Sequence, residues 1–187
     1  MSRFFLFLLL SMIWLIPAHA GPVADLGQKA EAMMASDPLA ALESLDQAVD
    51  QVWSAAPLLM RKALFVNSAS GYGIYDEREN AVFKVGEPLL VYGEPVGFAY
   101  GKNGLGGLEI SLVVDFVLVG EDGAELISRA DFAAFILPVR YRNREFQITL
   151  TLNLTGLPAG KYVGKFNLRD KYSDKTNMFE LPFEVAG

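Results

Sequence analysis

The chain has 187 residues, a formal net charge of −6, a single histidine and no cysteine. The histidine, His19, lies in an expected export signal, so the rest of the chain can form no disulfide and no catalytic site that depends on Cys or His. Zinc, copper and haem sites with their usual ligands are excluded there as well, and we predict no metal and no cofactor. An acidic chain without a basic cluster also argues against nucleic acid as a partner, because phosphates require Lys or Arg.

Residues 1–20 have the three parts of a cleavable secretory signal peptide. Arg3 supplies the positive charge, Phe4 to Ile16 form an uncharged apolar run, and Ala18-His19-Ala20 is the small-x-small pattern of a cleavage site. The apolar run is shorter than the roughly 20 residues that a membrane-spanning helix needs. We therefore expect cleavage after Ala20, a periplasmic or secreted location, and no transmembrane segment in the mature chain. Export without cysteine favours a bacterial envelope.

Residues 21–66 have a helical pattern. Asp25 to Ala35 is rich in good helix formers, and Ser36-Asp37-Pro38 combines a capping residue with a proline suited to a first helical turn. Apolar residues then recur at steps of three and four, which predicts an amphipathic helix that ends before Pro57. These residues are Leu39, Leu42, Leu45, Val49, Val52 and Trp53. We expect this face to dock on the β part of the chain, with Trp53 as a structural residue. The pattern from Leu58 to Val66 leaves a third short helix or a first strand open.

Residues 67–80 are dominated by turn residues, and we predict a linker loop there. From Ala81 the apolar pattern changes to a period of two, which is typical of strands. A long strand is expected from Leu108 to Val119, followed by a hairpin turn at Glu121-Asp122-Gly123 and a returning strand. Further strands are expected at residues 82–85, 89–92, 96–100, 124–129, 145–154, 161–169 and 178–185. Because Pro182 cannot donate to a strand ladder, the final strand should be an edge strand or contain a bulge.

The segment Leu157-Pro158-Ala159-Gly160-Lys161-Tyr162 resembles the tyrosine corner of immunoglobulin-like β-sandwiches. The resemblance implies that Tyr162 is structural and that its hydroxyl bonds to backbone a few residues upstream. It covers roughly residues 144–185 and, more loosely, everything from Ala81. The Cys–Trp–Cys core of antibody domains is missing, and the helical start has no counterpart in that fold.

The expected fold is therefore α+β. Two or three helices in residues 21–66 should dock on a mainly antiparallel, immunoglobulin-like β-sandwich of about seven to eight strands in residues 81–187. This architecture is shared by many unrelated functions, so the resemblance does not identify an activity.

We assign no catalytic residue from the sequence. Carboxylate pairs are the general acid–base chemistry that remains, as in glycoside hydrolysis, and the candidates are Glu94, Glu109, Asp115 and Asp131. Asp115 lies in an apolar stretch, where burial would raise its pKa. A serine nucleophile within Ser68 to Gly71, with Lys62 as its base, has no spacing motif to support it. Gly101 to Gly107 precedes a strand and lacks the motif of a phosphate-binding loop, so we predict a plain flexible loop.

The candidate binding residues lie mainly in the turn that precedes the last strand. Loops at one end of a sandwich commonly bind ligands, and this turn carries mixed charge around one aromatic ring. The candidates are Arg169, Lys171, Tyr172 and Asp174, together with Phe98 and Tyr100, whose rings suit a sugar or peptide surface unless they pack in the core.

From these features we expect an exported, non-enzymatic binding or protein-interaction module with a protein or glycan partner in the cell envelope. One alternative is a carboxylate-dependent enzyme acting on envelope glycans. The other is an envelope assembly factor that pairs with its partner through an edge strand near Pro182.

Overall fold

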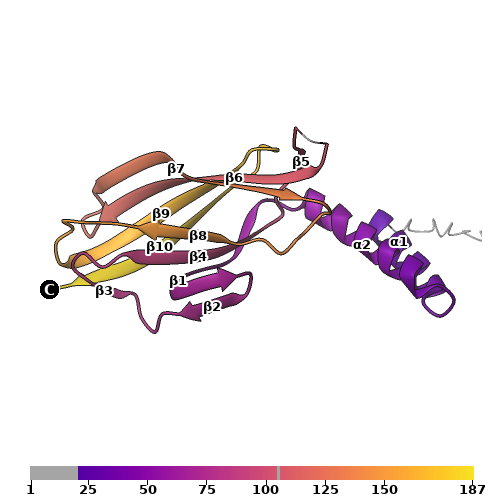
Figure 1. The fold of residues 1–187 in the computed structure, drawn as a ribbon, viewed down its shortest axis with the longest axis horizontal. Helices are drawn as coiled ribbons and strands as arrows, with labels where there is room; N and C mark the ends of the chain where they lie inside the picture. Colours follow the sequence, from indigo (N-terminus) through magenta and orange to yellow (C-terminus); the bar gives the residue numbers. More distant parts are fainter. Residues whose placement is uncertain (1–20, 105) are drawn as a thin grey trace, which may run out of the picture. The chain divides into compact units, whose positions relative to one another are not determined.

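The computed structural model describes residues 21–104 and 106–187. The predicted signal peptide and Leu105 lie outside the described residues. The chain forms two compact units that divide between Gln51 and Val52. We call residues 21–51 the helical unit and residues 52–187 the β unit, and describe each by itself. Two helices and ten strands are found among the described residues, which confirms the α+β class (Figure 1).

The helical unit is a hairpin of α1 (Pro22–Met33) and α2 (Pro38–Ala55), the last turn of which belongs to the β unit. The predicted start of α2 is confirmed, because Pro38 is its first residue and the Asp37 side chain accepts a hydrogen bond of 3.1 Å from the backbone N–H of Ala40. Asp37 thus satisfies one of the N–H groups that a helix leaves free at its beginning.

The helical unit buries small side chains. The buried residues are Ala30 of α1 and Ala41, Ser44 and Ala48 of α2, and the Ser44 hydroxyl donates to the Leu26 carbonyl at 2.9 Å. The large side chains that the sequence assigned to the buried face are exposed, with Leu39 67% and Leu42 61% accessible. A hydrophobic pattern marks only the larger residues, so the buried small residues of α2 were not identified from the sequence. Docking of the helical segment on the β part of the chain stays a prediction.

The first sheet of the β unit has the order β2-β1-β4-β8, with antiparallel pairing throughout. Its strands are β1 (Leu59–Gly71), β2 (Ile74–Glu77), β4 (Leu89–Val96) and β8 (Ile148–Leu152). The open question after Leu58 is therefore settled as a strand. The predicted linker loop at residues 67–80 is wrong, because the end of β1, a turn at Gly73 and β2 form a hairpin there. The Gly73 N–H donates to the Tyr92 hydroxyl at 2.7 Å, so a residue of β4 fixes a turn that composition alone marks as a loop.

The second sheet has the order β3-β10-β9-β6-β5, and β7 pairs with β6. Its strands are β3 (Val82–Lys84), β5 (Gly101–Lys102), β6 (Leu108–Gly120), β7 (Glu125–Val139), β9 (Gly160–Asp170) and β10 (Thr176–Ala186). Only β3 and β10 pair in parallel among the described strands. The predicted strands at residues 89–92 and 96–100 are corrected, because β4 continues without a break to Val96 and residues 97–100 are not a strand. Cross-strand pairing with β1 and β8 keeps Gly93 in the ladder.

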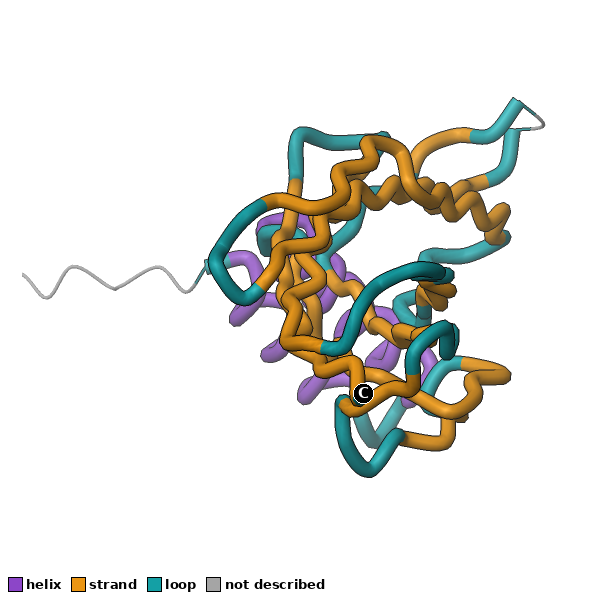
Figure 2. The backbone as a smooth tube through the Cα atoms, turned by 90° about the vertical axis from the view of Figure 1, so that its left-hand side faces the viewer, coloured by secondary structure: helices purple, strands orange, loops and turns teal. Residues whose placement is uncertain are grey.

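The core lies between the two sheets. Alternate residues of β6 face it and are at most 2% exposed, as the sequence pattern predicts. They are Ile110, Leu112, Val114, Phe116 and Leu118. They pack with the inward residues of β4, β8 and β9, and Figure 2 shows the strands that surround this core in orange.

Trp53 fixes the last turn of α2 within the β unit. Its indole N–H donates to the Phe98 carbonyl at 2.8 Å, and the two rings meet edge to face with centroids 5.0 Å apart. The ammonium group of Lys175 donates to the Ser54 carbonyl at 3.0 Å. These contacts support the structural role predicted for Trp53.

The corner before β9 has the local geometry expected from the resemblance. Tyr162 is buried, and its hydroxyl donates to the Pro158 carbonyl at 2.9 Å. The Tyr162 ring also stacks on Phe183 of β10 at 5.6 Å. Tyr162 therefore ties the segment before β9 to the core.

Candidate functional site

The two predicted binding segments come together at one end of the β unit. Asp170, at the end of β9, is buried, and its Oδ2 accepts a hydrogen bond of 2.6 Å from the Ala99 N–H. The same carboxylate accepts from the Tyr172 N–H at 2.9 Å and from the Ser173 hydroxyl at 2.8 Å. Asp170 therefore shapes the β9–β10 turn and attaches it to the segment before β5.

Lys175 makes a second link between these segments. Its ammonium group donates to the Gly97 carbonyl at 2.8 Å, in addition to the Ser54 carbonyl. Because Lys175 closes the turn that Asp170 opens, both ends of the turn are held by the neighbouring backbone. The turn is consequently a fixed surface feature and not a free loop.

Tyr172 supplies the aromatic ring of this turn, and its side chain is exposed. Its hydroxyl donates to the Glu109 carboxylate at 2.5 Å, which raises the pKa of Tyr172. A Cβ atom at Gly101 would lie 2.1 Å from the Tyr172 ring, so the ring covers the backbone of β5. The candidate Glu109 is thus held by a tyrosine hydroxyl.

The other predicted binding residues divide between surface and core. Lys171 and Asp174 are exposed, as a binding role requires. Phe98 is 1% exposed, so its assignment to a binding surface is wrong: it packs against Trp53 and Phe146 in the core. Tyr100 is half-buried, and its hydroxyl donates to the Asn143 carbonyl at 2.7 Å.

Arg169 binds two carboxylates on the outer face of the second sheet. It forms two hydrogen bonds to Asp115, at 2.8 and 2.9 Å, and one to Asp131 at 2.5 Å. The hydrogen bond from Arg169 is the main reason that the pKa of Asp115 is lowered to about 2. A general acid needs a raised pKa, so the expectation of a raised pKa at Asp115 is wrong, and the geometry gives this carboxylate a structural task.

The remaining catalytic candidates also lack a reactive arrangement. Glu94 is buried and accepts a hydrogen bond of 2.9 Å from the Tyr92 hydroxyl. Lys62 donates to the Tyr75 hydroxyl, which raises the pKa of Lys62, whereas a lysine base needs a lowered pKa. Ser68 and Ser70 lie within β1, where no hydrogen bond to Lys62 is found among the described contacts. No group of three or more acidic side chains among residues 21–104 and 106–187 is arranged to hold a metal ion.

The sequence analysis predicted only the first part of β7, at residues 124–129, and missed its continuation to Val139, where β7 forms one margin of the second sheet (Figure 1). Within the described residues, β7 pairs with β6 alone, so its other edge is open. Ile136 is 63% and Leu126 49% exposed. Phe132–Leu137, a run of six residues without charge or proline, is compatible with a strand. It has no alternation of apolar and polar residues, so the period-two pattern did not identify it.

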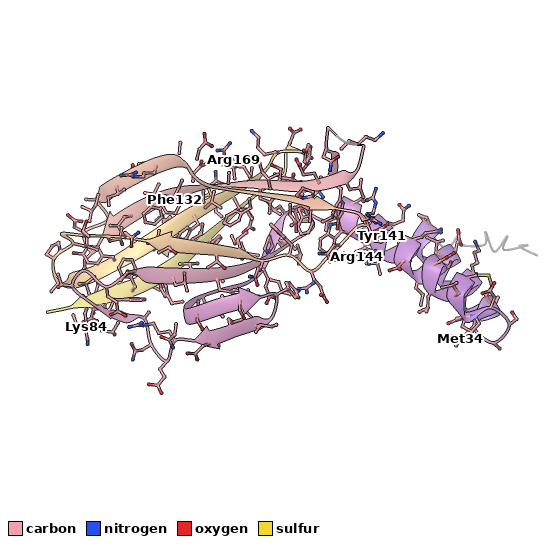
Figure 3. All side chains as sticks on the ribbon, viewed as in Figure 1. Met34, Lys84, Phe132, Tyr141, Arg144 and Arg169 are labelled. Carbon is pink, nitrogen blue, oxygen red and sulfur yellow. The ribbon has the colours of Figure 1, made fainter. Side chains whose placement is uncertain are left out.

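A bulge interrupts β7 at Asp131. The pairing of β6 with β7 shifts between Val114 and Phe116, and Asp131 has a φ of 51°, which is uncommon for a residue other than glycine. The Asp131 N–H donates to Asp115 at 2.9 Å, and Arg169 binds the Asp131 carboxylate. Figure 3 labels Arg169 and Phe132, the first residue after the bulge. The Asp115–Arg169 pair therefore fixes where the uncharged part of the edge begins.

The surface of the β unit has several concave regions, of which two border residues of interest. A groove of about 490 Å³ is lined by Val82 of β3, Pro182 and Glu184 of β10, Lys161 and Val163 of β9 and the turn after β6. A second one of about 390 Å³ borders Asp115, Lys165 and Met178. Neither brings together the catalytic candidates of the sequence analysis.

Comparisons with known proteins leave the family of the chain open. No protein-family model matches it, and no curated protein matches it either. Similar solved structures include the alkylpurine DNA glycosylase AlkC of Pseudomonas fluorescens, with 10% identity, 88% of this chain and 47% of that chain covered, and a TM-score of 0.39. A family 123 glycoside hydrolase of Clostridium perfringens has 11% identity, with 71% of this chain and 28% of that chain covered, and a TM-score of 0.37. A superoxide reductase of Ignicoccus hospitalis has 16% identity, with 75% of this chain and 90% of that chain covered, and a TM-score of 0.30. The chain spans less than half the length of the first two. No helix of the described residues has the length and apolar character to cross a bilayer.

Proposed function

We propose that the protein is an exported, non-enzymatic protein-interaction module whose β unit is an immunoglobulin-like sandwich. The open edge of β7 carries this proposal, because an unpaired strand edge presents N–H and C=O groups to a partner strand. The Tyr162–Pro158 hydrogen bond supports the immunoglobulin-like assignment. The apolar run before residue 17 and the Ala18-His19-Ala20 pattern support export.

The open edge has a defined length. Asp131 ends it on one side with the bulge, and Pro138, which has no N–H, ends it on the other. Between them lies Phe132–Leu137, which we call the edge segment. Natural sheets protect exposed edges with charge, proline or bulges, and this chain places those devices only at the two ends. An uncharged edge of this length is an aggregation hazard unless a partner covers it.

The edge near Pro182, which the sequence analysis proposed for strand pairing, is less favourable. β10 pairs with β9 along its length, and its other edge pairs with β3 only at residues 184–186. Pro182 lies in the unpaired part of that edge and removes one donor from it. The edge segment of β7 has all its backbone donors, so we propose β7 as the pairing strand.

Photocrosslinking in the envelope of cells that make the protein tests the proposal. We would replace Ile136 with benzoylphenylalanine and use the same replacement at Met178 of β10, which is similarly exposed, as the matched control. We expect an adduct with another protein at position 136 and none at position 178. An adduct formed equally at both positions, or none at 136, contradicts strand addition at β7.

A proline substitution tests whether the contact is a backbone pairing. Alternate residues of a strand point their N–H groups the same way, so Ala134 shares the direction of Pro138, whose nitrogen should face the open edge. Ala134→Pro should leave the pairing with β6 intact and abolish the adduct at position 136. An adduct that persists in a folded Ala134→Pro protein contradicts the proposal that the partner pairs with the backbone of β7. An adduct with a second copy of the chain contradicts the proposal that the partner is a different protein.

Export has an independent test. The intact mass of the protein from the periplasmic fraction should correspond to a chain that begins at Gly21. A chain that keeps residues 1–20 and sediments with the membranes contradicts cleavage and with it the proposed location.

A further inference from the structure

The two sheets of the β unit differ in width. Among the described residues, the first sheet has four strands side by side, in the order β2-β1-β4-β8. In the second sheet, β3, β10, β9, β6 and β7 follow one another across the width. The short strand β5 adds no width, because it pairs with Leu108 and Glu109 on the edge of β6 opposite to β7, where it continues the line of β9. The second sheet is therefore one strand wider than the first.

Contacts between the sheets show which strands face each other. The rings of Phe65 in β1 and Phe183 in β10 have centroids 6.0 Å apart. The guanidinium group of Arg78, the residue after β2, lies 4.1 Å from the centre of the Phe83 ring in β3. β1 thus faces β10, and β2 faces β3. Counted from there across stacked sheets, β4 faces β9 and β8 faces β6, so no strand of the described part of the first sheet faces β7.

The inward side chains of β7 are apolar but incompletely covered. Phe135 pairs with Leu112 and Leu137 pairs with Ile110, so these residues of β7 point to the same side as the core residues of β6. Leu112 and Ile110 are both 0% exposed, whereas Leu137 is 36% exposed and Phe135 is half-buried. Apolar surface of β7 therefore remains accessible on the side where a facing strand would lie.

β8 ends the first sheet with an open edge. It pairs with β4 on one side, and no strand of the described residues pairs with its other side. We call this open side of Ile148–Leu152 the β8 edge. Residues 146–154 contain no charge and no proline, which commonly protect an edge against strand addition. A strand added at the β8 edge would widen the first sheet by one strand and would face β7.

We propose that the β8 edge binds one extended segment of a partner protein in which large apolar residues alternate with polar residues. The backbone of the segment pairs with β8, and its apolar side chains face β7 and cover Phe135 and Leu137. Its polar side chains lie on the outer face beside Thr149 and Thr151, which are half-buried and exposed.

The width of the uncovered surface selects a single segment as the occupant. The second sheet extends only one strand beyond β8. A second copy of this chain does not fit by pairing its β8 with the β8 edge, because its own β6 would then have to lie where β7 already lies. The proposed segment is also distinct from a strand at the open edge of β7, which would lie in the second sheet and contact β7 through its backbone.

A synthetic peptide serves as the probe. It has about nine residues in which leucine alternates with threonine, followed by a pair of arginines for solubility. Its matched control contains the same residues in an order without alternation. Fluorescence anisotropy of each labelled peptide is measured against the purified mature protein. We expect the probe to bind at least about tenfold more tightly than the control, because only alternation places all the leucines on one face of a strand.

N-methylation of the probe tests the backbone pairing. Alternate residues of a strand direct their N–H groups to the same edge, so methylation of one alternate set blocks one edge of the probe. A probe that pairs with β8 alone should bind with one set methylated and bind at least about tenfold more weakly with the other set methylated. Equal affinities of the two methylated peptides contradict pairing at a single edge.

Two substitutions in β7 test which face the probe covers. Leu137→Ser removes an apolar contact from the inward face and should weaken the probe about fivefold or more. Ile136→Ser is the matched control, because Ile136 pairs with Ser111 and points to the opposite face of the same strand. It should leave the affinity unchanged. Unchanged affinity in the Leu137→Ser protein, or equal weakening in both proteins, overturns the proposal.

A further pair of experiments separates the β8 edge from the edge of β7. Benzoylphenylalanine at position 151 should form an adduct with the probe, whereas the same replacement at Met178 of β10 should not. Ala134→Pro should leave the affinity for the probe unchanged, because it blocks only the open edge of β7. Loss of probe binding in a folded Ala134→Pro protein places the probe at β7, which overturns the present proposal and supports the proposed function.

The remaining outcomes identify other occupants. An affinity for the probe that rises about tenfold or more in a Leu42→Ser, Leu45→Ser protein assigns the uncovered face of β7 to the helical segment of this chain and overturns the proposal. A dimer in sedimentation that Leu137→Ser dissociates assigns that face to a second copy of the chain and has the same consequence.

Discussion

Arg169 binds Asp115 through two hydrogen bonds, of 2.8 and 2.9 Å, across neighbouring strands of the second sheet. The pairing register places Asp115 opposite Asn167, whose side-chain amide adds a third hydrogen bond at 3.1 Å. Such bidentate pairs between a guanidinium group and a carboxylate are both strong and geometrically specific. The pair also holds the backbone of Asp131, and through it the bulge of β7. A residue considered for catalysis thus organises the edge of a sheet.

The lowered pKa of Asp115 predicts a loss of stability in acid. The pKa of Asp115 is about 2 in the folded protein, against an ordinary value of 3.8, so the pair stabilises the fold above pH 4 and loses this effect as the pH falls towards 2. Asp115→Asn should lower the free energy of unfolding at pH 7 by about 2 kcal/mol. Urea unfolding of both proteins at pH 7, 5, 3 and 2 measures the difference.

The control for that experiment is Glu121→Gln, an exposed carboxylate in the turn after β6. Its stability should follow the unsubstituted protein at every pH. The difference caused by Asp115→Asn should shrink as the pH approaches 2, because the unsubstituted carboxyl is then protonated as well. A constant difference from pH 7 to pH 2 would show that the substitution acts through packing and not through charge.

Tyr162→Phe tests the corner before β9. The substitution keeps the ring on Phe183 and removes only the hydroxyl that donates to Pro158. We expect a loss of about 1 kcal/mol, rising to about 3 if the Pro158 carbonyl finds no other donor. Chemical denaturation measures it, with Tyr141→Phe, at a highly exposed tyrosine, as the control. An unchanged midpoint would weaken the immunoglobulin-like assignment.

The predicted strands were those in which one face is buried and the other wet, as in β9, where Tyr162, Gly164, Phe166 and Leu168 alternate with half-buried or exposed residues. The hairpin of β1 and β2 was missed because its residues are turn formers that pair through contacts from elsewhere, such as the Tyr92 hydroxyl on Gly73. Such a contact between distant residues cannot be predicted from local composition.

The candidate site shows the same limit. The mixed charge of the β9–β10 turn was visible in the sequence, but its attachment to Ala99 joins residues 71 positions apart. The Arg169–Asp115 pair joins residues 54 apart, so the structural role of both was hidden. On α2 the apolar period was read correctly, but the buried small residues Ala41 and Ala48 were not identified, because a hydrophobic pattern marks only the larger side chains.

Trp53 is the only tryptophan in residues 21–187, so its fluorescence reports on the end of α2 without interference. Because the indole is buried and bonded to Phe98, we expect blue-shifted emission in the folded protein. The shift to longer wavelength on denaturation should coincide with the loss of the β-sheet signal in circular dichroism, since Trp53 belongs to the β unit. Emission like that of free indole while the sheets are intact contradicts this anchor.

The contact of Tyr172 with Gly101 gives the most specific prediction for the loop end of the β unit. A methyl group at Gly101 would lie 2.1 Å from the Tyr172 ring, so Gly101→Ala must displace the ring and break its hydrogen bond to Glu109. We expect the free energy of unfolding to fall by about 1–3 kcal/mol, the usual cost of overpacking. The ring should move and the backbone of β5 should stay, because a side chain moves more easily than a paired strand.

A double-mutant cycle shows whether the ring is the cause. In a Tyr172→Ala protein the added methyl group meets open space, so Gly101→Ala should then cost less than about 0.5 kcal/mol. Urea unfolding of the four proteins gives the coupling, and the absorbance of the tyrosines at high pH supplies a second readout. Glu109 raises the pKa of Tyr172 through the hydrogen bond, so Gly101→Ala should move one tyrosine titration to lower pH. Equal costs of Gly101→Ala in both backgrounds, with an unchanged titration, would mean that the strain lies in β5 itself and that the turn is not held by Tyr172.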